Sequence, residues 1–366
     1  MRYTAVPKIA IVAPSLGILG GQAVQAKVLA DCLRSDGYDV DFVPINPPFP
    51  IGTGWLKRLP FIRTLVNQGL YLPSLRRLRH ADVVQIFSAS YWSFLLAPLP
   101  AILAARLLNK PIILNYHSGE ANDHLAHWGS LVHPWLKMVD EIVVPSAFLR
   151  DVFARYGYRA KVVHNVIDMG RFRYRRRASL SPAFLSVRNF EPHYGVEDTL
   201  IAFALLRTRF PDATLTVAGL GPQEAELKRL ADALLLRNVR FIGPVAPESM
   251  PSLYESHAIF LNSSFVDNQP LSILEAMASG MAIVTTGVGD IPSMIKDGVS
   301  GSLVPAGDPS AMAKASAQLL EQPERAVLMG QRAKDSLARF AWKNVGPAWA
   351  DIYRRLSGEC SALEAA

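Results

Sequence analysis

The chain has little cysteine and lacks any long uninterrupted apolar run. Its 366 residues include only two cysteines, Cys32 and Cys360, whose separation gives neither a disulfide framework nor the spacing of metal ligands. The nearest approach to a spanning segment, Trp92 to Leu108, contains two prolines and an arginine and stays short of the roughly 20 apolar residues that cross a bilayer. We therefore expect a protein of the reducing cytoplasm, either soluble or peripheral at the inner face of the cell membrane.

Half of the residues are hydrophobic, which indicates a folded globular protein. The length suits two domains of ordinary size, each able to bury its own core. The N-terminal run Ile9–Ala13, ended by Pro14, is typical of a buried strand rather than of a secretion signal. A net charge of +7 favours anionic partners, a class that includes nucleotides, acidic lipids and nucleic acid.

Short β-branched runs alternate with helical patterns twice along the chain, which predicts parallel sheets with right-handed crossovers. The fold class is therefore α/β, with two Rossmann-like, doubly wound domains that we expect to face each other across a cleft. We expect domain boundaries at 1–167, 168–182 for a basic linker, 183–340, and 341–366 for a C-terminal helix and tail. The predicted strands are Ile9–Ala13, Val40–Pro44, Val83–Phe87, Ile112–Tyr116, Ile142–Pro145, Ala183–Val187, Leu215–Ala218, Val239–Ile242, Ile259–Asn262 and Ile283–Thr286.

In the linker, five arginines alternate with Phe172 and Tyr174. Interleaved arginines and aromatics can bind single-stranded nucleic acid by charge and stacking. A solvated connection between domains is the commoner use of such a run. We therefore predict a linker and no nucleic-acid partner.

The most informative segment is 267–280, because it combines two carboxylates with the start of a helix. Pro270 suits the first helical turn, and Gly280 supplies a left-handed residue that ends a helix. Free amides at the helix entrance and the positive end of the helix dipole make a pyrophosphate site. Glu275, more than a turn further in, is placed to accept hydrogen bonds from ribose hydroxyls. The segment thus indicates a site for a nucleotide-diphosphate sugar, although an ordinary helix packed on a sheet has the same pattern.

This segment resembles the signature of the family-4 retaining glycosyltransferases, in which an acidic residue, seven intervening residues and a glutamate precede Ala-Met-Ala-x-Gly. Asp267 stands where the family usually has glutamate, while Glu275 and the run Ala276–Gly280 keep the pattern. The resemblance covers nearly the whole chain and implies the GT-B fold of the glycosyl transferases group 1. It also implies that the C-terminal helix crosses back to the first domain.

The resemblance extends to other motifs around the expected donor. Arg188 matches the arginine that clamps the donor phosphates, but Tyr194 replaces the lysine of the same element and carries no charge. The donor-binding residues that the sequence and the resemblance indicate are Gly20, Gly21, Arg188, Tyr194, Gly219, Asn268, Gln269, Pro270, Leu271, Ser272 and Glu275.

The resemblance also implies three catalytic residues, His117, Asp267 and Arg188. His117 follows a buried strand and would lie beside the transferred sugar. Asp267 would orient that sugar, and Arg188 would stabilise the leaving diphosphate together with the helix entrance. Because fixed positive groups would do this work, we expect no metal and no cofactor beyond the nucleotide-sugar substrate.

The span Asn46 to His80 places basic residues beside large apolar ones. Such a segment can lie on anionic lipid headgroups, and contact with a membrane through residues 55–80 would bring the protein to a lipid-linked glycan. An acceptor-side insertion packed on its own domain has the same composition. Both interpretations stay open at this point.

The predicted function is retaining, metal-independent transfer of a sugar, as in hexosyltransferases of polysaccharide biosynthesis, to a glycan, lipid-linked or small-molecule acceptor. Two alternatives remain. One is an isomerase similar to the nucleotide-sugar 2-epimerases, which share this architecture. The other is a non-catalytic nucleotide-sugar-binding protein, for which Tyr194 is the best argument.

Overall fold

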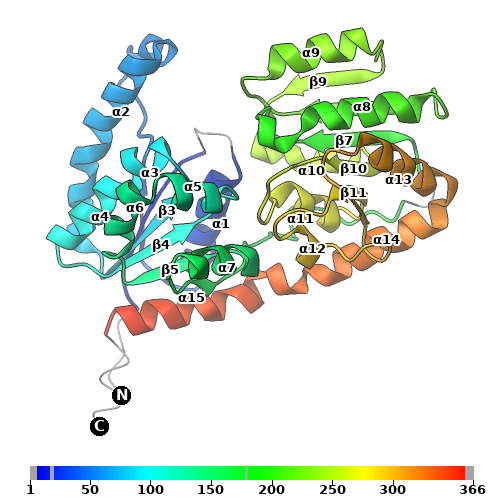
Figure 1. Cartoon of the computed structure of the whole chain (residues 1–366). Helices are drawn as coiled ribbons and strands as arrows, with labels where there is room; N and C mark the ends of the chain where they lie inside the picture. Colours follow the sequence, from blue (N-terminus) through cyan, green and yellow to red (C-terminus); the bar gives the residue numbers. More distant parts are fainter. Residues whose placement is uncertain (1–5, 17–19, 178–179, 359–366) are drawn as a thin grey trace. The chain divides into compact units, whose positions relative to one another are not determined.

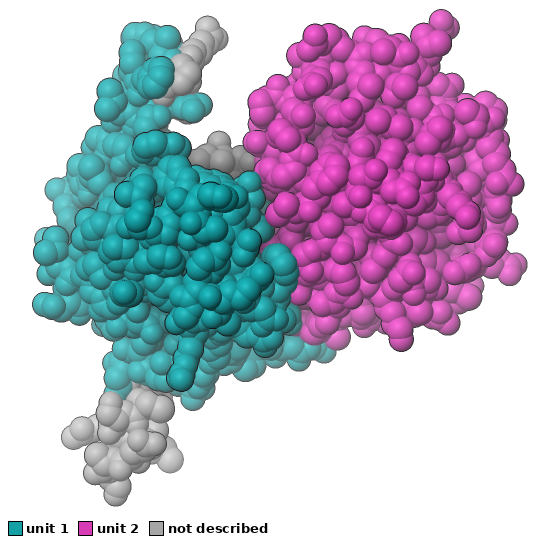
Figure 2. All heavy atoms as spheres, viewed as in Figure 1, with its two compact units in different colours: residues 1–166, 342–366 teal, residues 167–341 magenta. Residues whose placement is uncertain are grey.

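The computed structural model describes residues 6–16, 20–177 and 180–358 (Figure 1). The chain divides into two compact units, drawn in different colours in Figure 2. Unit 1 contains residues 1–166 and 342–366, and unit 2 contains residues 167–341. Unit 2 is therefore inserted in the sequence between two parts of unit 1.

Unit 1 is built on a six-stranded sheet in the order β2-β1-β3-β4-β5-β6, and every neighbouring pair is parallel. Its strands are β1 (Ile9–Ala13), β2 (Val40–Pro44), β3 (Val83–Ser88), β4 (Ile112–Tyr116), β5 (Glu141–Val144) and β6 (Lys161–Val162). Its helices are α1 (Gly21–Ser35), α2 (Pro60–Ser74), α3 (Trp92–Leu96), α4 (Pro98–Leu107), α5 (Ala121–His127), α6 (Gly129–Leu136), α7 (Ala147–Arg155) and α15 (Trp342–Leu356), with 3-10 turns η1 (Gly54–Arg58) and η2 (Leu75–His80).

The strands of unit 1 are apolar on both faces because helices cover both faces of the sheet. On β1, Ile9 and Ile11 pack into the cluster formed with α1 and α15, whereas Ala10 and Val12 pack into the cluster on the other face. This alternation is the period of two expected for a strand. Helix α15 contributes Trp349 and other large side chains to the first cluster.

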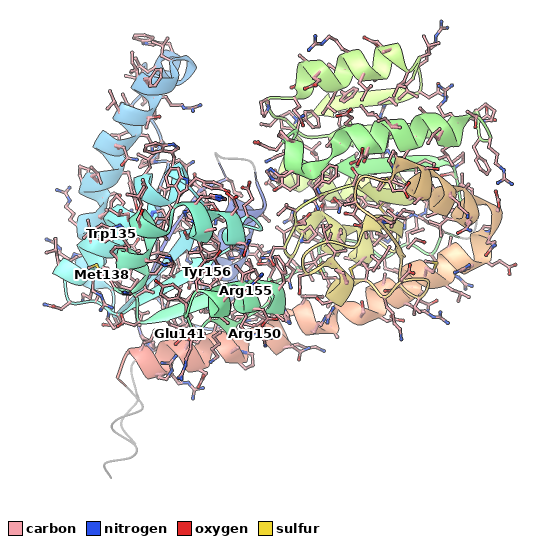
Figure 3. The ribbon with its side chains drawn as sticks, in the orientation of Figure 1. Trp135, Met138, Glu141, Arg150, Arg155 and Tyr156 are labelled. Atoms are coloured by element: carbon pink, nitrogen blue, oxygen red, sulfur yellow. The ribbon has the colours of Figure 1, made fainter. Side chains whose placement is uncertain are left out.

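Polar contacts also hold α15 to unit 1. Trp342 Nε1 donates to Asp36 at 2.9 Å, and Lys161 forms an ion pair with Asp351 at 2.8 Å. Glu141, which lies next to the ribbon of α15 in Figure 3, is ion-paired with Arg355. The last helix of the described chain is therefore an integral part of the first unit.

Unit 2 has a second six-stranded parallel sheet, in the order β12-β11-β10-β7-β8-β9. Its strands are β7 (Ala183–Val187), β8 (Thr214–Ala218), β9 (Val239–Gly243), β10 (Ile259–Asn262), β11 (Ala282–Thr286) and β12 (Ser302–Val304). Its helices are α8 (Val196–Arg207), α9 (Glu224–Ala233), α10 (Met250–Glu255), α11 (Leu271–Ala278), α12 (Ile291–Met294), α13 (Pro309–Glu321) and α14 (Pro323–Asp335), with 3-10 turns η3 (Pro192–Tyr194), η4 (Pro247–Ser249) and η5 (Ser336–Phe340).

The strand order of unit 2 reverses its direction at the neighbours β7 and β10. From β7 the chain builds outward through β8 and β9, and it then returns to build outward through β10, β11 and β12 on the other side. In a doubly wound sheet the loops that leave such a pair of strands diverge, one to each face, and open a crevice at the carboxyl edge. The segments after Val187 and after Asn262 therefore border the expected ligand site of this unit.

The structure confirms the α/β class, the two doubly wound units and all ten predicted strands, with ends that differ by a residue at most. Two short strands, β6 and β12, were not predicted, because two or three residues carry too little pattern.

The expectation of a solvated linker is wrong for two of its residues. Phe172 is buried in the core of unit 2, and so is the guanidinium of Arg177. Arg177 donates to the carbonyl oxygens of His257 at 2.8 Å, Ser279 at 2.6 Å and Tyr254 at 2.8 Å. Burial lowers the pKa of Arg177 to about 10, which still leaves it charged at neutral pH. This basic segment is thus not only a connection between the units, because Phe172 and Arg177 belong to the interior of unit 2.

Candidate functional site

Arg188 lies one residue beyond β7, at the carboxyl edge of the unit 2 sheet. Its Nε donates to Asn262 Oδ1 at 2.7 Å, and its Nη2 forms an ion pair with Asp267. Both side chains of this pair are nearly buried, with 10% and 9% of their surface exposed. Asn262 is held in turn, since it accepts from Ser264 Oγ and donates to Thr285 Oγ1, each at 2.9 Å. The guanidinium is therefore fixed in place before any ligand binds.

Asp267 is oriented from three sides. Its Oδ2 contacts Arg188, and its Oδ1 accepts from the backbone amide of Asn268 at 2.9 Å. Gly289, at φ 57°, brings the backbone after β11 against the carbonyl of Asp267, where an added Cβ would lie 1.8 Å from that oxygen. Because these contacts fix a nearly buried carboxylate, Asp267 is a rigid acceptor at the edge of the sheet.

Tyr194 supports Arg188 rather than replacing the charge of a lysine. The centre of the Arg188 guanidinium lies 5.1 Å from the centroid of the Tyr194 ring, a cation–π contact. The ring of His193 lies 4.2 Å from the same phenol. A phenol can donate one hydrogen bond but supplies no positive charge, so Arg188 is the cation that this part of the site contributes.

The entrance of α11 carries groups without partners. From the sequence we expected Pro270 in the first turn of this helix, but it lies just before that turn, as the N-cap residue. Its carbonyl accepts from the amides of Ile273 at 3.2 Å and Leu274 at 3.3 Å. The amides of Leu271 and Ser272 have no partner among the described residues. The buried hydroxyl of Ser272 likewise has none. Two amides, a hydroxyl and the helix dipole together form a potential anion site.

Glu275 is half-buried one turn further along α11. Burial raises its pKa to about 7, while Tyr254 and then Arg171 oppose that shift. The carboxyl is thus partly protonated near neutral pH, and its ionised form is an acceptor for hydroxyl groups. Asn268 and Gln269, between Asp267 and α11, are both buried.

Gly219 stands behind Arg188. At φ 154° it follows β8, and an added Cβ would lie 1.8 Å from the Arg188 carbonyl oxygen. The Arg188 amide donates to Ala218, and the Gly219 amide donates to Gly243, both at 3.0 Å. Only glycine fits this close approach of two loops, so Gly219 positions the backbone of Arg188.

The remaining predicted residues belong to unit 1. Gly20 caps α1 and Gly21 begins it, while residues 17–19 of the same loop lie outside the described residues. His117 follows β4 and stacks on Phe87 at 5.1 Å. Its Nε2 is buried without a partner, and burial lowers its pKa to about 4, which keeps the imidazole neutral at physiological pH.

Within unit 2 the structure brings together Arg188, Tyr194, Gly219 and Asp267, and it places the entrance of α11 within four residues of Asp267. Sequence reasoning missed the second layer, which includes Asn262 and Ser264. Their position directly after β10, the strand that neighbours β7, is the signal that could have indicated them.

The described part of the chain holds no group of three histidine, cysteine, aspartate or glutamate side chains that could bind a metal ion. None of the helices in that part combines the length and apolar character needed to cross a membrane. Cys32 is half-buried in α1, and Cys360 lies outside the described residues.

Two parallel, doubly wound units joined in one chain define the GT-B class of α/β proteins. Two family descriptions match nearly consecutive parts of the sequence: "Glycosyltransferase Family 4" over residues 19–171 and "Glycosyl transferases group 1" over residues 174–336. The chain belongs to this family of glycosyltransferases.

Curated relatives agree with this assignment. A D-inositol 3-phosphate glycosyltransferase of Corynebacterium urealyticum is 33% identical over 43% of this chain and 39% of its own length. A glycogen synthase of Mycobacterium tuberculosis is 29% identical over 69% of this chain and 65% of its own. The chain thus spans less than two thirds of either relative. A phosphatidyl-myo-inositol mannosyltransferase of Mycolicibacterium smegmatis is 24% identical over 96% of this chain and 94% of its own.

Solved structures share the fold over nearly the whole chain. A sucrose-phosphate synthase from Thermosynechococcus elongatus aligns with a TM-score of 0.76 at 19% identity, covering 96% of this chain and 99% of that one. HepE of Anabaena in complex with UDP and glucose aligns with a TM-score of 0.73 at 18% identity, covering 94% and 99%. At this identity the likeness concerns the fold.

Proposed function

We propose that this protein is a retaining glycosyltransferase that moves a sugar from a nucleotide-diphosphate sugar to a glycan, lipid-linked or small-molecule acceptor. The observation that carries the proposal is the set of groups at the carboxyl edge of the unit 2 sheet. This set contains the fixed guanidinium of Arg188 and the nearly buried carboxylate of Asp267, which form an ion pair. It also contains the entrance of α11, where the hydroxyl of Ser272 has no partner. Few ligands need a cation, a polar acceptor and an anion-binding helix end together, and a nucleotide-diphosphate sugar is one of them.

The diphosphate would bind at the entrance of α11. The amides of Leu271 and Ser272 and the Ser272 hydroxyl can donate to phosphate oxygens without breaking a bond within the described residues. Arg188 keeps Nη1 for a phosphate, since its bonds to Asn262 and Asp267 use Nε and Nη2. Charge-assisted bonds of this kind contribute roughly 1.5–3 kcal/mol each. Tyr194 would add one neutral hydrogen bond.

Nucleoside recognition would come from Glu275, whose carboxylate can accept from both ribose hydroxyls. Its raised pKa suits this role, because a carboxyl that is costly to keep charged in the empty site gains from two donors when the ribose arrives. Asn268 and Gln269, in the same buried loop, would complete the wall beside the diphosphate and the sugar.

The transfer step would use the donor's own phosphate as the base. The acceptor oxygen forms a bond to the anomeric carbon while the bond from that carbon to the diphosphate oxygen breaks on the same face, and the acceptor proton passes to the leaving phosphate. Arg188 and the α11 entrance stabilise the charge that develops on the diphosphate. Asp267 orients the sugar. His117, neutral because its pKa is about 4, would act as a hydrogen-bonding group rather than as a charge.

The identity of the base is supported only by relatives. HepE of Anabaena was solved with UDP-glucose, and the TarM protein of S. aureus was solved with UDP. We therefore propose a UDP-sugar as donor, with a GDP-sugar as the competing choice. We further propose that unit 1 receives the acceptor and that the reaction takes place in the cytoplasm, where nucleotide sugars are made.

Thermal unfolding with UDP, GDP and ADP tests the donor site. A ligand at about 100 times its dissociation constant adds roughly 2.7 kcal/mol of stability, enough for a shift of a few degrees. We expect a shift with UDP that Glu275→Ala abolishes. Radiolabelled UDP-sugars with lipid-extract and glycan acceptors then test transfer.

One observation favours a second function. Tyr194 leaves the diphosphate with one cation fewer than the family pattern, which suits a protein that binds a nucleotide sugar without transferring it. Saturable UDP-sugar binding with no product from any acceptor would support this alternative. Conversion of a UDP-sugar in the absence of any acceptor would instead indicate an isomerase similar to the 2-epimerases.

A further inference from the structure

Helix α2 of unit 1, with the turn η1 before it, presents an unusual concentration of exposed apolar side chains. Phe61 is 87% exposed, Leu65 72% and Trp55 62%. Figures 1 and 2 show this end of α2 standing away from the rest of unit 1. We call the segment from Ile51 to Leu65 the α2 tip; its exposed large apolar residues are Ile51, Trp55, Leu59, Phe61, Ile62 and Leu65.

The other half of α2 is packed firmly on unit 1. Tyr71 is fully buried, and its hydroxyl donates to the Ala97 carbonyl at 2.8 Å. Asn67 donates to the Ile45 carbonyl at 2.8 Å, and Gln68 donates to the Leu96 carbonyl at 3.0 Å. The α2 tip is therefore an extension of an anchored helix, and its apolar side chains are not exposed merely because the helix is loosely attached.

The charge of this region has one sign. The residues from Phe42 to Ala81 include six lysines and arginines and no aspartate or glutamate. Three of the six, Lys57, Arg58 and Arg63, fall within the α2 tip itself. The other three, Arg76, Arg77 and Arg79, follow α2 and lie about 20 Å along the helix from its start. This distance exceeds the roughly 8–10 Å over which charges interact at physiological salt, so these three do not add to the charge of the tip. Among them, Arg77 is already ion-paired with Asp41.

We propose that the α2 tip docks on the surface of an anionic lipid bilayer, with its apolar side chains inserted between headgroups. A second copy of this chain is a poor occupant, because two such tips would bring together like charges with no acidic residue to pair them. Lipid headgroups of negative charge, by contrast, attract the cations while the acyl boundary receives the apolar side chains. An exposed tryptophan at such a tip suits the interface between water and hydrocarbon.

The test is co-sedimentation of the full chain with vesicles of phosphatidylcholine alone or with about one third phosphatidylglycerol. We expect binding to the anionic vesicles that weakens as salt rises. Each basic residue near the surface contributes about fivefold in affinity, so removing all three within the α2 tip is expected to lower binding by about 100-fold. Phe61→Asp with Leu65→Asp is expected to lower binding at least tenfold.

The matched control is Leu205→Asp with Leu328→Asp, which places the same two charges at exposed leucines of α8 and α14 in unit 2. It is expected to bind as the unaltered protein does. Because Phe61 and Leu65 are exposed, the double variant should unfold at the unaltered temperature, so a loss of binding cannot be ascribed to misfolding.

Any of three outcomes overturns the proposal. The first is equal binding to neutral and anionic vesicles, and the second is binding to neither. The third is concentration-dependent self-association in sedimentation velocity that the double variant abolishes. This result would make the α2 tip a subunit interface. No donor or acceptor enters these measurements, so they stand or fall independently of the proposed transfer reaction.

Discussion

The half-buried carboxyl of Glu275 makes donor affinity depend on pH. Its pKa of about 7 means that the ionised fraction rises from roughly one tenth at pH 6 to roughly nine tenths at pH 8. If the ionised form accepts from the ribose hydroxyls, the affinity for a UDP-sugar is expected to increase about tenfold over this range. Glu275→Gln, which keeps the size of the side chain, is expected to bind more weakly and without this slope.

Isothermal titration of an intact UDP-sugar is the suitable assay, because the diphosphate of the sugar nucleotide does not itself titrate between pH 6 and 8. A flat affinity in the unaltered protein, or the same slope in Glu275→Gln, would refute the assigned role.

The same residue has an effect on the free energy of unfolding without ligand. Since the folded pKa is raised from 4.5 to about 7, folding favours the protonated carboxyl. The unaltered protein is therefore expected to lose up to about 3 kcal/mol of stability between pH 4.5 and 8 relative to Glu275→Gln. Calorimetry at several pH values measures this difference, and Glu226→Gln, at an exposed glutamate of α9, is the control that should show none.

Three further substitutions test the site and its support. Tyr194→Lys restores the cation of the family pattern and is expected to tighten UDP binding about tenfold, whereas unchanged binding would show that this position lies away from the diphosphate. Gly219→Ala places a Cβ 1.8 Å from a carbonyl oxygen and is expected to lower both thermal stability and UDP affinity, while Gly69→Ala in α2, where nothing lies within 4 Å, should lower neither. Arg177→Met removes the hydrogen-bond donor of three carbonyl groups and is expected to destabilise unit 2 by about 3 kcal/mol in denaturant titration. A change below about 1 kcal/mol would contradict the inference that these hydrogen bonds stabilise unit 2.

Much of the fold was predictable because buried parallel strands are almost wholly apolar. Ile9–Ala13 and Ile112–Tyr116 are examples, since every residue in each is buried. Short runs such as Lys161–Val162 have no period to detect and were missed. The family pattern supplied the function, and Asp267 and Glu275 carried most of it.

The sequence could not reveal how the site is held together. Arg188 and Asp267 are 79 residues apart, and their ion pair depends on the order of strands in the sheet, which periodicity does not report. The stacking of Arg188 on Tyr194 turns an apparent departure from the family pattern into support for the arginine. Arg177 was misjudged because composition alone cannot distinguish a solvated arginine from one surrounded by carbonyl groups.

The insertion of unit 2 between two parts of unit 1 has a consequence for synthesis on the ribosome. When Ala341 has been added, unit 2 is complete, but the sheet of unit 1 still lacks α15, which covers one of its faces together with α1. The part of this face that α1 does not cover then stays open to water until Trp349 and Tyr353 have emerged. The first unit to be synthesised is thus the last to be finished, and the nascent chain carries a partly uncovered apolar face for the whole time that 175 intervening residues are made.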